Sequence, residues 1–171
     1  MDLVKFTSAI KSFTAEQVFS LKEAVESHKL TILLGNGGSN SVCSHIAQDY
    51  TKALGKRAVT FSDPSRLTCY INDYGMERAY AQFVSEFADS DTLVILVSSS
   101  GNSLNIFNAA AYCVSIGIDF ITLTGFDACN KVRVAWSDSA VIDVWVDSQD
   151  YGIVECAHQV FLHSIIGDIV L

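Results

Sequence analysis

Two hydrophobic periodicities alternate along most of this chain. From residue 31 onward, short apolar runs rich in β-branched residues predict strands at 31–34, 58–61, 92–97, 120–124 and 140–146. Between and after these runs, apolar residues recur every three or four positions and predict helices at about 39–53, 64–70, 76–88, 102–116 and 152–170. We therefore expect a doubly wound, flavodoxin-like α/β fold: a five-stranded parallel sheet flanked by helices, with ligands at the carboxyl ends of the strands.

Helical spacing of apolar residues also precedes this alternating region. Thr14 and Gln17 have the spacing of a capping box, so we expect an N-terminal helix pair with a break before the second helix. The apolar faces of these helices belong either to the core or to a subunit interface, and the sequence favours neither. No linker or repeat is evident, so we expect a single domain over 1–171, with N-terminal helices in 1–28 and an α/β core in 31–171.

Composition narrows the functional classes. Half of the 171 residues are hydrophobic and only 18% are charged, which points to surface buried between subunits and hence to a homo-oligomer. The formal net charge of −8 argues against a nucleic-acid binder, because phosphate contacts along a nucleic acid need clustered Lys and Arg. It leaves room for one local site that holds a small phosphorylated molecule.

Cysteine usage and the hydropathy of the ends indicate the compartment. The five cysteines are scattered without CxxC or zinc-finger spacing, as expected of reduced thiols in the cytoplasm. The N-terminus lacks the apolar core of a signal peptide, and no apolar run reaches the roughly 18 residues of a membrane span. We expect a cytoplasmic protein without a membrane segment.

A glycine-rich turn, Gly35-Asn-Gly-Gly-Ser39, follows the first predicted strand. It is neither a dinucleotide fingerprint, whose third glycine is replaced by Asn40, nor a Walker loop, because no Lys follows. Gly37 and Gly38 lack a Cβ and allow the backbone to approach a ligand, at a helix N-terminus that favours an anion. A purely structural turn is the alternative.

A serine-rich loop follows the third predicted strand and opens the next helix. Hydroxyl groups and backbone amides at a helix N-terminus suit a phosphate group without any Lys or Arg. One serine would be an ordinary helix cap, but four around a glycine favour anion binding. The four are Ser98, Ser99, Ser100 and Ser103.

Two helices carry polar residues in register. His45 and Asp49 lie four residues apart on the first core helix and therefore share one face. On the otherwise apolar last helix, Glu155, Gln159 and His163 form a single ridge. Polar groups on such a helix are costly without partners, so this ridge is either a set of satisfied core residues or part of a site. Taken alone, the segment Asn72-Asp-Tyr-Gly75 reads as a turn between two helices.

Taken in order, these motifs resemble the sugar isomerase (SIS) domain proteins of the phosphoheptose isomerase group. The resemblance covers roughly residues 31–165 and implies a cytoplasmic homotetramer that converts sedoheptulose 7-phosphate to D-glycero-D-manno-heptose 7-phosphate, in heptose biosynthesis. It implies a phosphate site at the four serines and a sugar site lined by Asn36, Gly37, Gly38, Ser39, Asn72 and Asp73. It also implies a zinc ion held by His45, Asp49, Glu155 and His163.

The chain departs from the pattern of this group at several positions. Asp49 replaces a Glu, Glu155 replaces a Gln, and Ala53 with its neighbour Lys52 stands where an Arg is expected. Every changed position of the implied metal site can still ligate. The departures therefore indicate a coherent variant, whose substrate can differ.

The chemistry implied by the resemblance is aldose–ketose isomerisation through an enediol, which needs a general acid and a general base. Asp49 and His163 are assigned these roles, with zinc polarising the sugar oxygens. Sites are expected to combine neighbouring subunits, the first core helix of one meeting the last helix of another. The alternatives are an isomerase of another phosphosugar and a non-catalytic SIS protein that binds a sugar phosphate or a protein partner.

Overall fold

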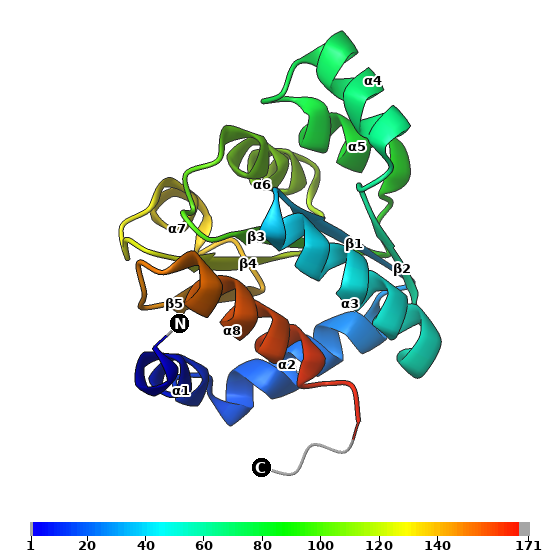
Figure 1. The fold of residues 1–171 in the computed structure, drawn as a ribbon. Coiled ribbons are helices and arrows are strands. Elements are labelled where there is room, and N and C mark those ends of the chain that lie inside the picture. Colours follow the sequence, from blue (N-terminus) through cyan, green and yellow to red (C-terminus); the bar gives the residue numbers. More distant parts are fainter. Residues whose placement is uncertain (1, 168–171) are drawn as a thin grey trace.

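The computed structural model describes residues 2–167 and contains the expected parallel sheet (Figure 1). The strand order is β2-β1-β3-β4-β5, and all four strand pairs are parallel. The strands are β1 (Leu30–Gly35), β2 (Arg57–Thr60), β3 (Thr92–Ser98), β4 (Phe120–Gly125) and β5 (Ile142–Val146). This is the doubly wound, flavodoxin-like order, so the predicted fold class is confirmed.

Helices cover both faces of the sheet and create two cores. One core lies under α2 (Ala15–Ser27), α3 (Gly38–Leu54) and α8 (Tyr151–His163). The opposite core lies under α5 (Ala79–Phe87), α6 (Leu104–Ile116) and α7 (Lys131–Trp136). All seven residues of β3 are buried, as expected of a central strand that is covered on both faces.

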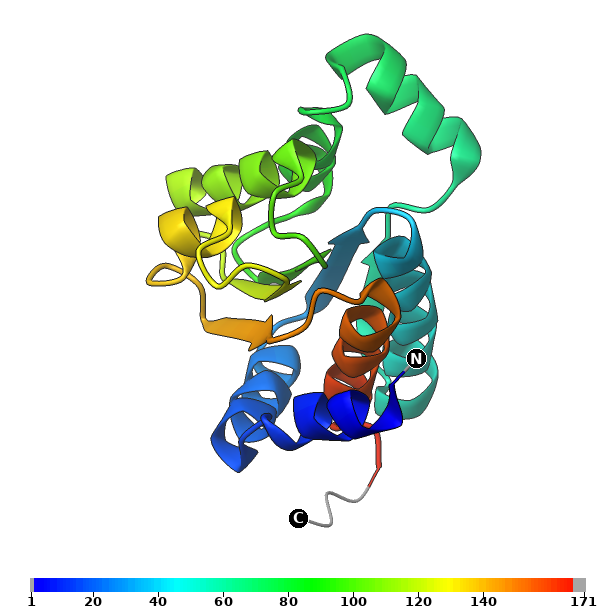
Figure 2. The same cartoon turned by 60° about the vertical axis from the view of Figure 1, so that its left-hand side comes forward.

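The N-terminal helix pair is confirmed, including its capping box. Thr14 Oγ1 accepts a hydrogen bond from the Gln17 amide at 3.1 Å, and Gln17 Oε1 accepts one from the Thr14 amide at 3.0 Å. α2 buries Leu21 completely in the core, whereas α1 (Leu3–Lys11) packs on the outside of α8 and leaves Val4 81% exposed (Figure 2). The apolar face of α2 is therefore core, and part of α1 faces outward.

Helix boundaries show where local patterns mislead. α4 (Pro64–Tyr74) continues past the predicted end at 70, so Asn72 and Asp73 lie in its last turn and the predicted turn there is wrong. Gly75 ends the helix, with a φ of 80° that suits glycine. α5 begins at Ala79 rather than at 76.

Two further differences lie in the C-terminal half. α7 was not predicted, because its six residues are too few for a helical period to stand out. The last helix ends at His163 rather than at 170, and positions 168–170 of that prediction lie outside the described residues. Within residues 2–167, no helix combines the length and hydropathy that a membrane span requires.

The sheet order fixes where a ligand would bind. The chain leaves β1 toward β2 on one side and returns to β3 on the other, so the order reverses between β1 and β3. Gly35 at the end of β1 pairs with Val97 near the end of β3, which places the glycine turn beside the serine loop. A crevice at such a switch point is the usual binding site of this architecture.

Candidate active site

The crevice at the switch point is a polar pocket. Its eight lining residues come from the glycine turn, the serine loop and the first two turns of α8. They are Asn36, Ser39, Ser98, Ser99, Ser100, Ser103, Tyr151 and Glu155. Six of them were predicted to bind substrate. None of the eight carries a positive charge, so hydroxyl groups, amides and helix dipoles must supply any attraction for an anion.

The serine loop is held rigidly and leaves its hydroxyl groups available. Gly101 has a φ of 61°, and a Cβ there would overlap the Asn130 side chain. Among residues 2–167, the buried Ser99 hydroxyl has no hydrogen-bond partner, and Ser103 caps α6 without a side-chain hydrogen bond. A hydroxyl group without a protein partner, close to a helix N-terminus, is a donor that a bound anion can satisfy.

The glycine turn forms the opposite wall of the pocket. Gly37 has a φ of 54° and is the N-cap residue of α3, so the N-terminus of this helix has no side-chain cap. A Cβ at Gly38 would overlap the carboxylate of Glu155, so a larger residue would displace this side chain from its place beside the start of α3. Gly37 is therefore favoured by its backbone conformation, and the missing side chain of Gly38 leaves room for Glu155 in the pocket.

Asn72 and Asp73 lie outside this pocket. They are exposed at the end of α4, which packs against α5 and projects beyond the sheet (Figures 1 and 2). Asn72 Nδ2 donates to Asp73 Oδ1 at 2.8 Å, and the Cys69 thiol donates to the same carboxylate. The structure does not bring these two predicted sugar ligands to the other lining residues.

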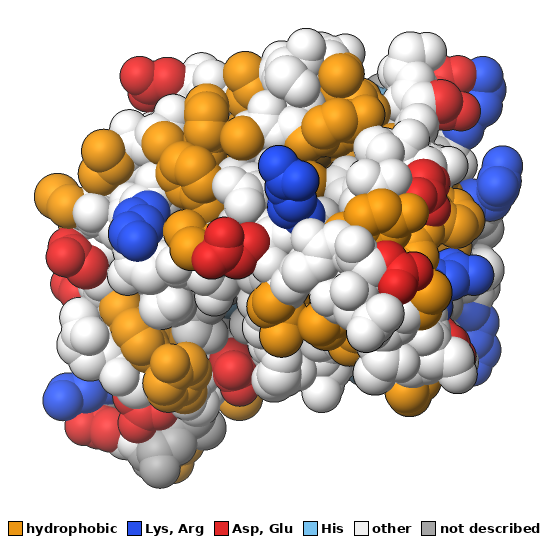
Figure 3. Space-filling view, turned by 90° about the horizontal axis from the view of Figure 1, so that it is seen from above, with side chains coloured by type: hydrophobic (Ala, Val, Ile, Leu, Met, Phe, Trp, Pro, Cys, Tyr) orange, Lys and Arg blue, Asp and Glu red, His pale blue; other side chains and the backbone are white. Residues whose placement is uncertain are grey.

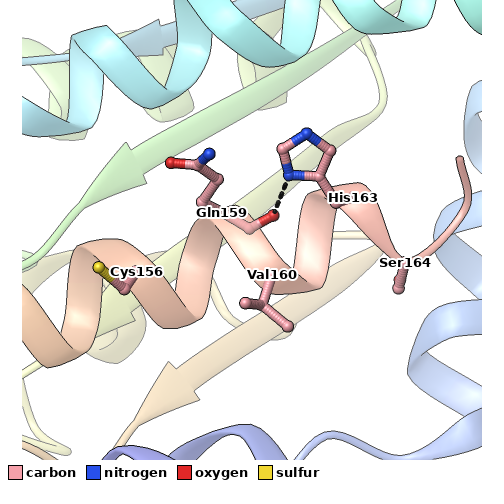
Figure 4. Close-up of a pocket in the computed structure, with 5 residues that line it drawn as sticks. All are labelled: Cys156, Gln159, Val160, His163 and Ser164. Atoms are coloured by element: carbon pink, nitrogen blue, oxygen red, sulfur yellow. Dashed lines mark hydrogen bonds between the residues drawn. The ribbon is translucent and has the colours of Figure 1, made fainter.

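A second polar group forms where α3 and α8 lie side by side. His45 Nε2 and His163 Nε2 lie 3.4 Å and 3.0 Å from Asp49 Oδ2, and ligating atoms of the three side chains lie within 4.8 Å of one another. The His163 ring points from α8 toward α3 (Figure 4). The same side chain lines a surface pocket together with Cys156, Gln159, Val160 and Ser164. The structure thus assembles three of the four predicted metal ligands.

The tautomer of His163 indicates that the His45–Asp49–His163 cluster needs a positive charge between the ring and the carboxylate. Nδ1 lies 3.1 Å from the Gln159 carbonyl oxygen and must donate its hydrogen there (Figure 4). In a neutral ring, Nε2 would then direct a lone pair at the Asp49 carboxylate. A second proton on the ring, or a cation shared by Nε2 and Oδ2, removes this repulsion. Two imidazoles and one carboxylate are a ligand set of catalytic zinc sites, so the residues fit that metal.

Glu155, the fourth predicted ligand, lies in the serine pocket instead of in this cluster. It faces Gly38 and the start of α3, two helical turns from His163. Burial raises the pKa of its carboxyl group above the ordinary value. This position therefore brings a carboxyl group into the serine-lined pocket.

One subunit suffices to bring the two helices together. The Asp49–His163 contact joins α3 and α8 of the same chain, so this pair forms without the predicted contact between subunits.

Seen from above, the surface shows hydrophobic patches separated by charged side chains, with no single dominant apolar face on that side (Figure 3).

Sequence reasoning missed two residues that support the pocket. Tyr80 on α5 and Asn105 on α6 hydrogen-bond the Asn36 side chain. Asn105 directly follows the serine loop region and carries the only sequence signal, an amide on an apolar helix. Tyr80 gives no signal, because its partner is 44 residues away.

The fold and the crevice define a class of protein: a doubly wound α/β domain with a serine-lined polar pocket at its topological switch point. The chain belongs to the SIS domain family, whose model matches residues 11–125. It is 30% identical over 169 residues to the phosphoheptose isomerase of Helicobacter pylori, a match that covers 95% of this chain and 85% of that protein.

Solved structures show the same fold. The phosphoheptose isomerase of Neisseria gonorrhoeae superposes with a TM-score of 0.86 at 23% identity, covering 95% of this chain and 91% of that one. The Vibrio vulnificus NanR protein complexed with ManNAc-6P superposes with a TM-score of 0.74 at 16% identity, covering 98% of this chain and 58% of that one.

Replacing Glu155 by Gln is expected to strengthen the binding of sugar phosphate at neutral pH by about tenfold, because like charges in one pocket repel. As the pH falls, Glu155 of the unmodified protein takes up a proton and the difference should disappear. Calorimetric titration at several pH values measures this. Glu23→Gln on the exposed surface of α2 removes the same charge and should change nothing. Weaker binding in the Glu155→Gln protein would contradict this assignment.

His158, which points away from the ridge, gives a prediction about stability. It is fully buried, its Nε2–H donates to the Thr124 carbonyl at 3.0 Å, and burial lowers its pKa to about 4 from 6.5. Between these two pKa values the unfolded chain binds a proton that the folded chain does not. The free energy of unfolding should therefore decrease as the pH is lowered from 6.5 to about 4, by about 3 kcal/mol in total.

Urea unfolding across this pH range tests the prediction. His158→Gln keeps an N–H donor but cannot titrate, so its free energy of unfolding should depend less on pH. His28→Gln, which removes the histidine that follows the last residue of α2, is the control. Equal pH dependence in the His158→Gln and unmodified proteins would refute the role given to His158.

Proposed function

We propose that this protein is an aldose–ketose isomerase of sugar phosphates, with sedoheptulose 7-phosphate as substrate and D-glycero-D-manno-heptose 7-phosphate as product. One observation carries the proposal: the serine pocket and the Asp49–His163 pair lie along the same two helices. Along α3, the backbone rises by about 9 Å from Ser39 to His45 and by about 15 Å from Ser39 to Asp49. Helix side chains lean toward the N-terminus, which brings the Asp49 carboxylate nearer to the pocket. We expect an extended seven-carbon sugar phosphate, rather than a shorter one, to place its phosphate at one group and its carbonyl end at the other.

The residues of the chain divide the chemistry between them. The hydroxyl groups of Ser98, Ser99, Ser100 and Ser103, with the amides that begin α6, hold and orient the phosphate. At the other end, one member of the Asp49–His163 pair removes the proton from C1 of the ketose while the other protonates O2. The resulting enediol loses the O1 proton and regains one at C2, which restores both groups. Their 3.0 Å contact allows the proton to pass between them.

Zinc fits this proposal as a cofactor held by His45, Asp49 and His163. When bound, it would supply a positive charge that polarises the sugar oxygens and stabilises the developing oxyanion. Glu155 could join these ligands only by leaving the serine pocket.

The resemblance to the phosphoheptose isomerase group also leads us to expect a homotetramer. Leu3 and Val4 on α1 are 69% and 81% exposed and supply apolar surface for contact between subunits.

The experiment that tests the function is incubation with sedoheptulose 7-phosphate and zinc, read by the appearance of the aldose. Asp49 and Glu155 differ from the residues of the phosphoheptose isomerase group, so the substrate can differ as well. Parallel incubations with shorter ketose phosphates therefore identify which sugar phosphate is converted.

The second candidate is a non-catalytic sugar-phosphate sensor. It is favoured by the position of Glu155 in the serine pocket, which leaves the His45–Asp49–His163 cluster one predicted ligand short, and by the occurrence of this fold in the NanR protein complexed with ManNAc-6P. The two candidates differ in one result. A sensor binds the sugar phosphate and leaves it unchanged, whereas the isomerase releases an aldose.

A further inference from the structure

A buried tyrosine stands behind the glycine turn. Tyr80 on α5 is 2% exposed, and its hydroxyl oxygen lies 2.5 Å from the Gly35 carbonyl oxygen and 3.0 Å from Asn36 Oδ1. Gly35 ends β1, and Asn36 lines the pocket. The tyrosine therefore touches both the end of the central strand and a residue that faces the ligand.

A chain of hydrogen bonds fixes which way the Asn36 amide points. The Ile106 backbone N–H donates to Asn105 Oδ1 at 3.0 Å, so this atom must be the oxygen. Asn36 Nδ2 then donates to Asn105 Oδ1 at 3.0 Å, and Asn105 Nδ2 donates to Asn36 Oδ1 at 2.9 Å. With its oxygen turned toward Tyr80 and Asn105, Asn36 retains one Nδ2 hydrogen for the pocket.

We propose that Tyr80 is a positioning residue, which holds Asn36 so that its Nδ2–H is offered to an acceptor oxygen of the bound sugar phosphate. The identity of the ligand rests on the proposed function, whereas the orientation of Asn36 does not. The same network joins the glycine turn to the first turn of α6, next to the serine loop. The Asn36–Asn105 pair thus links the two walls of the pocket, and Tyr80 supports this pair from the side of the glycine turn.

Removing the hydroxyl group should release this constraint. In Tyr80→Phe, the Gly35 carbonyl and Asn36 Oδ1 lose a shared donor, so only the two hydrogen bonds to Asn105 still orient the Asn36 amide. The ring itself stays, with its aromatic contacts to Phe61. The loss is therefore confined to one hydroxyl group that does not line the pocket.

A double-mutant cycle separates positioning from a merely structural role. We expect Tyr80→Phe to weaken calorimetric binding of sedoheptulose 7-phosphate by about tenfold, the scale of one buried hydrogen bond. In the Asn36→Ala background, the same substitution should change affinity by less than about twofold, because there is no amide left to orient. Equal weakening in both backgrounds, or no weakening in either, would overturn the proposal.

A matched control and an arm without ligand complete the test. Tyr70→Phe removes a hydroxyl group from the same aromatic cluster, but that group bonds Glu86 at the surface, so affinity should not change. In ¹⁵N spectra of the free protein, the Asn36 side-chain NH₂ hydrogens should exchange slowly with solvent, and Tyr80→Phe should speed their exchange and move their chemical shifts toward those of a free side-chain amide. Unchanged exchange and chemical shifts overturn the positioning role. If the unmodified protein does not bind the sugar phosphate, the proposed function fails and the spectra still decide this proposal.

Discussion

Replacing His163 by Ala, or Asp49 by Asn, is expected to lower the isomerisation rate by about a thousandfold, the usual range for loss of a general acid or base. Each substitution removes one member of the only proton-transfer pair that the described residues offer between α3 and α8. Binding of the sugar phosphate should change by less than about threefold, because the phosphate is held elsewhere. Single-turnover rates and calorimetric affinities, measured on the same preparations, test both statements.

A matched control exists in the chain. His28 and Asp119 form another histidine–aspartate pair, at 3.4 Å, outside the pocket. Asp119→Asn makes the same chemical change as Asp49→Asn and should leave turnover unaffected. The His163→Ala protein should also bind zinc more weakly in titrations, since it loses one of three ligands. Retention of full turnover in either active-site variant would remove the assigned acid–base pair.

Combined replacement of Ser98 and Ser100 by Ala is expected to weaken sugar-phosphate binding by about a hundredfold, because hydrogen bonds to a charged partner are the strong ones. The pocket lining offers no cation to compensate for the lost hydroxyl groups. The melting temperature should stay within a few degrees, because neither hydroxyl supports a strand or helix ladder. Calorimetric titration and thermal unfolding measure the two quantities.

Ser115→Ala is the control for these serines. Its hydroxyl donates to the Tyr112 carbonyl at the opposite end of α6, so the substitution removes a serine of the same helix far from the pocket. Affinity should be unchanged. If the double variant binds as tightly as the unmodified protein, the serine loop is a helix cap and nothing more.

Hydrophobic periodicity predicted the strands of the sheet, because the burial of a strand is visible in its own run of apolar residues. Every strand lies within two residues of its predicted position, and β3, apolar on both faces, is buried along its whole length. Periodicity failed where a segment is short or lightly buried. α7 has six residues, and α4 has none that is buried, so the turn assigned to Asn72 and Asp73 rested on residue preference alone.

The site shows the same division between local and long-range information. The glycine turn, the serine loop and the His45–Asp49 pair are local motifs, and the sequence contained each of them. Which motifs meet depends on strand order and helix packing. Glu155 and His163 share a ridge, yet one lies in the serine pocket and the other against Asp49.

The central claim is that a sugar phosphate bound at the serine loop is isomerised by the Asp49–His163 pair. The most direct test is to incubate the zinc-loaded protein with sedoheptulose 7-phosphate in D₂O and to follow the sugar by NMR. We predict an aldose phosphate that carries solvent deuterium at C2, with none formed by the Asp49→Asn or His163→Ala proteins. Binding of the sugar phosphate with neither aldose nor deuterium incorporation would contradict the claim and identify the protein as a sensor.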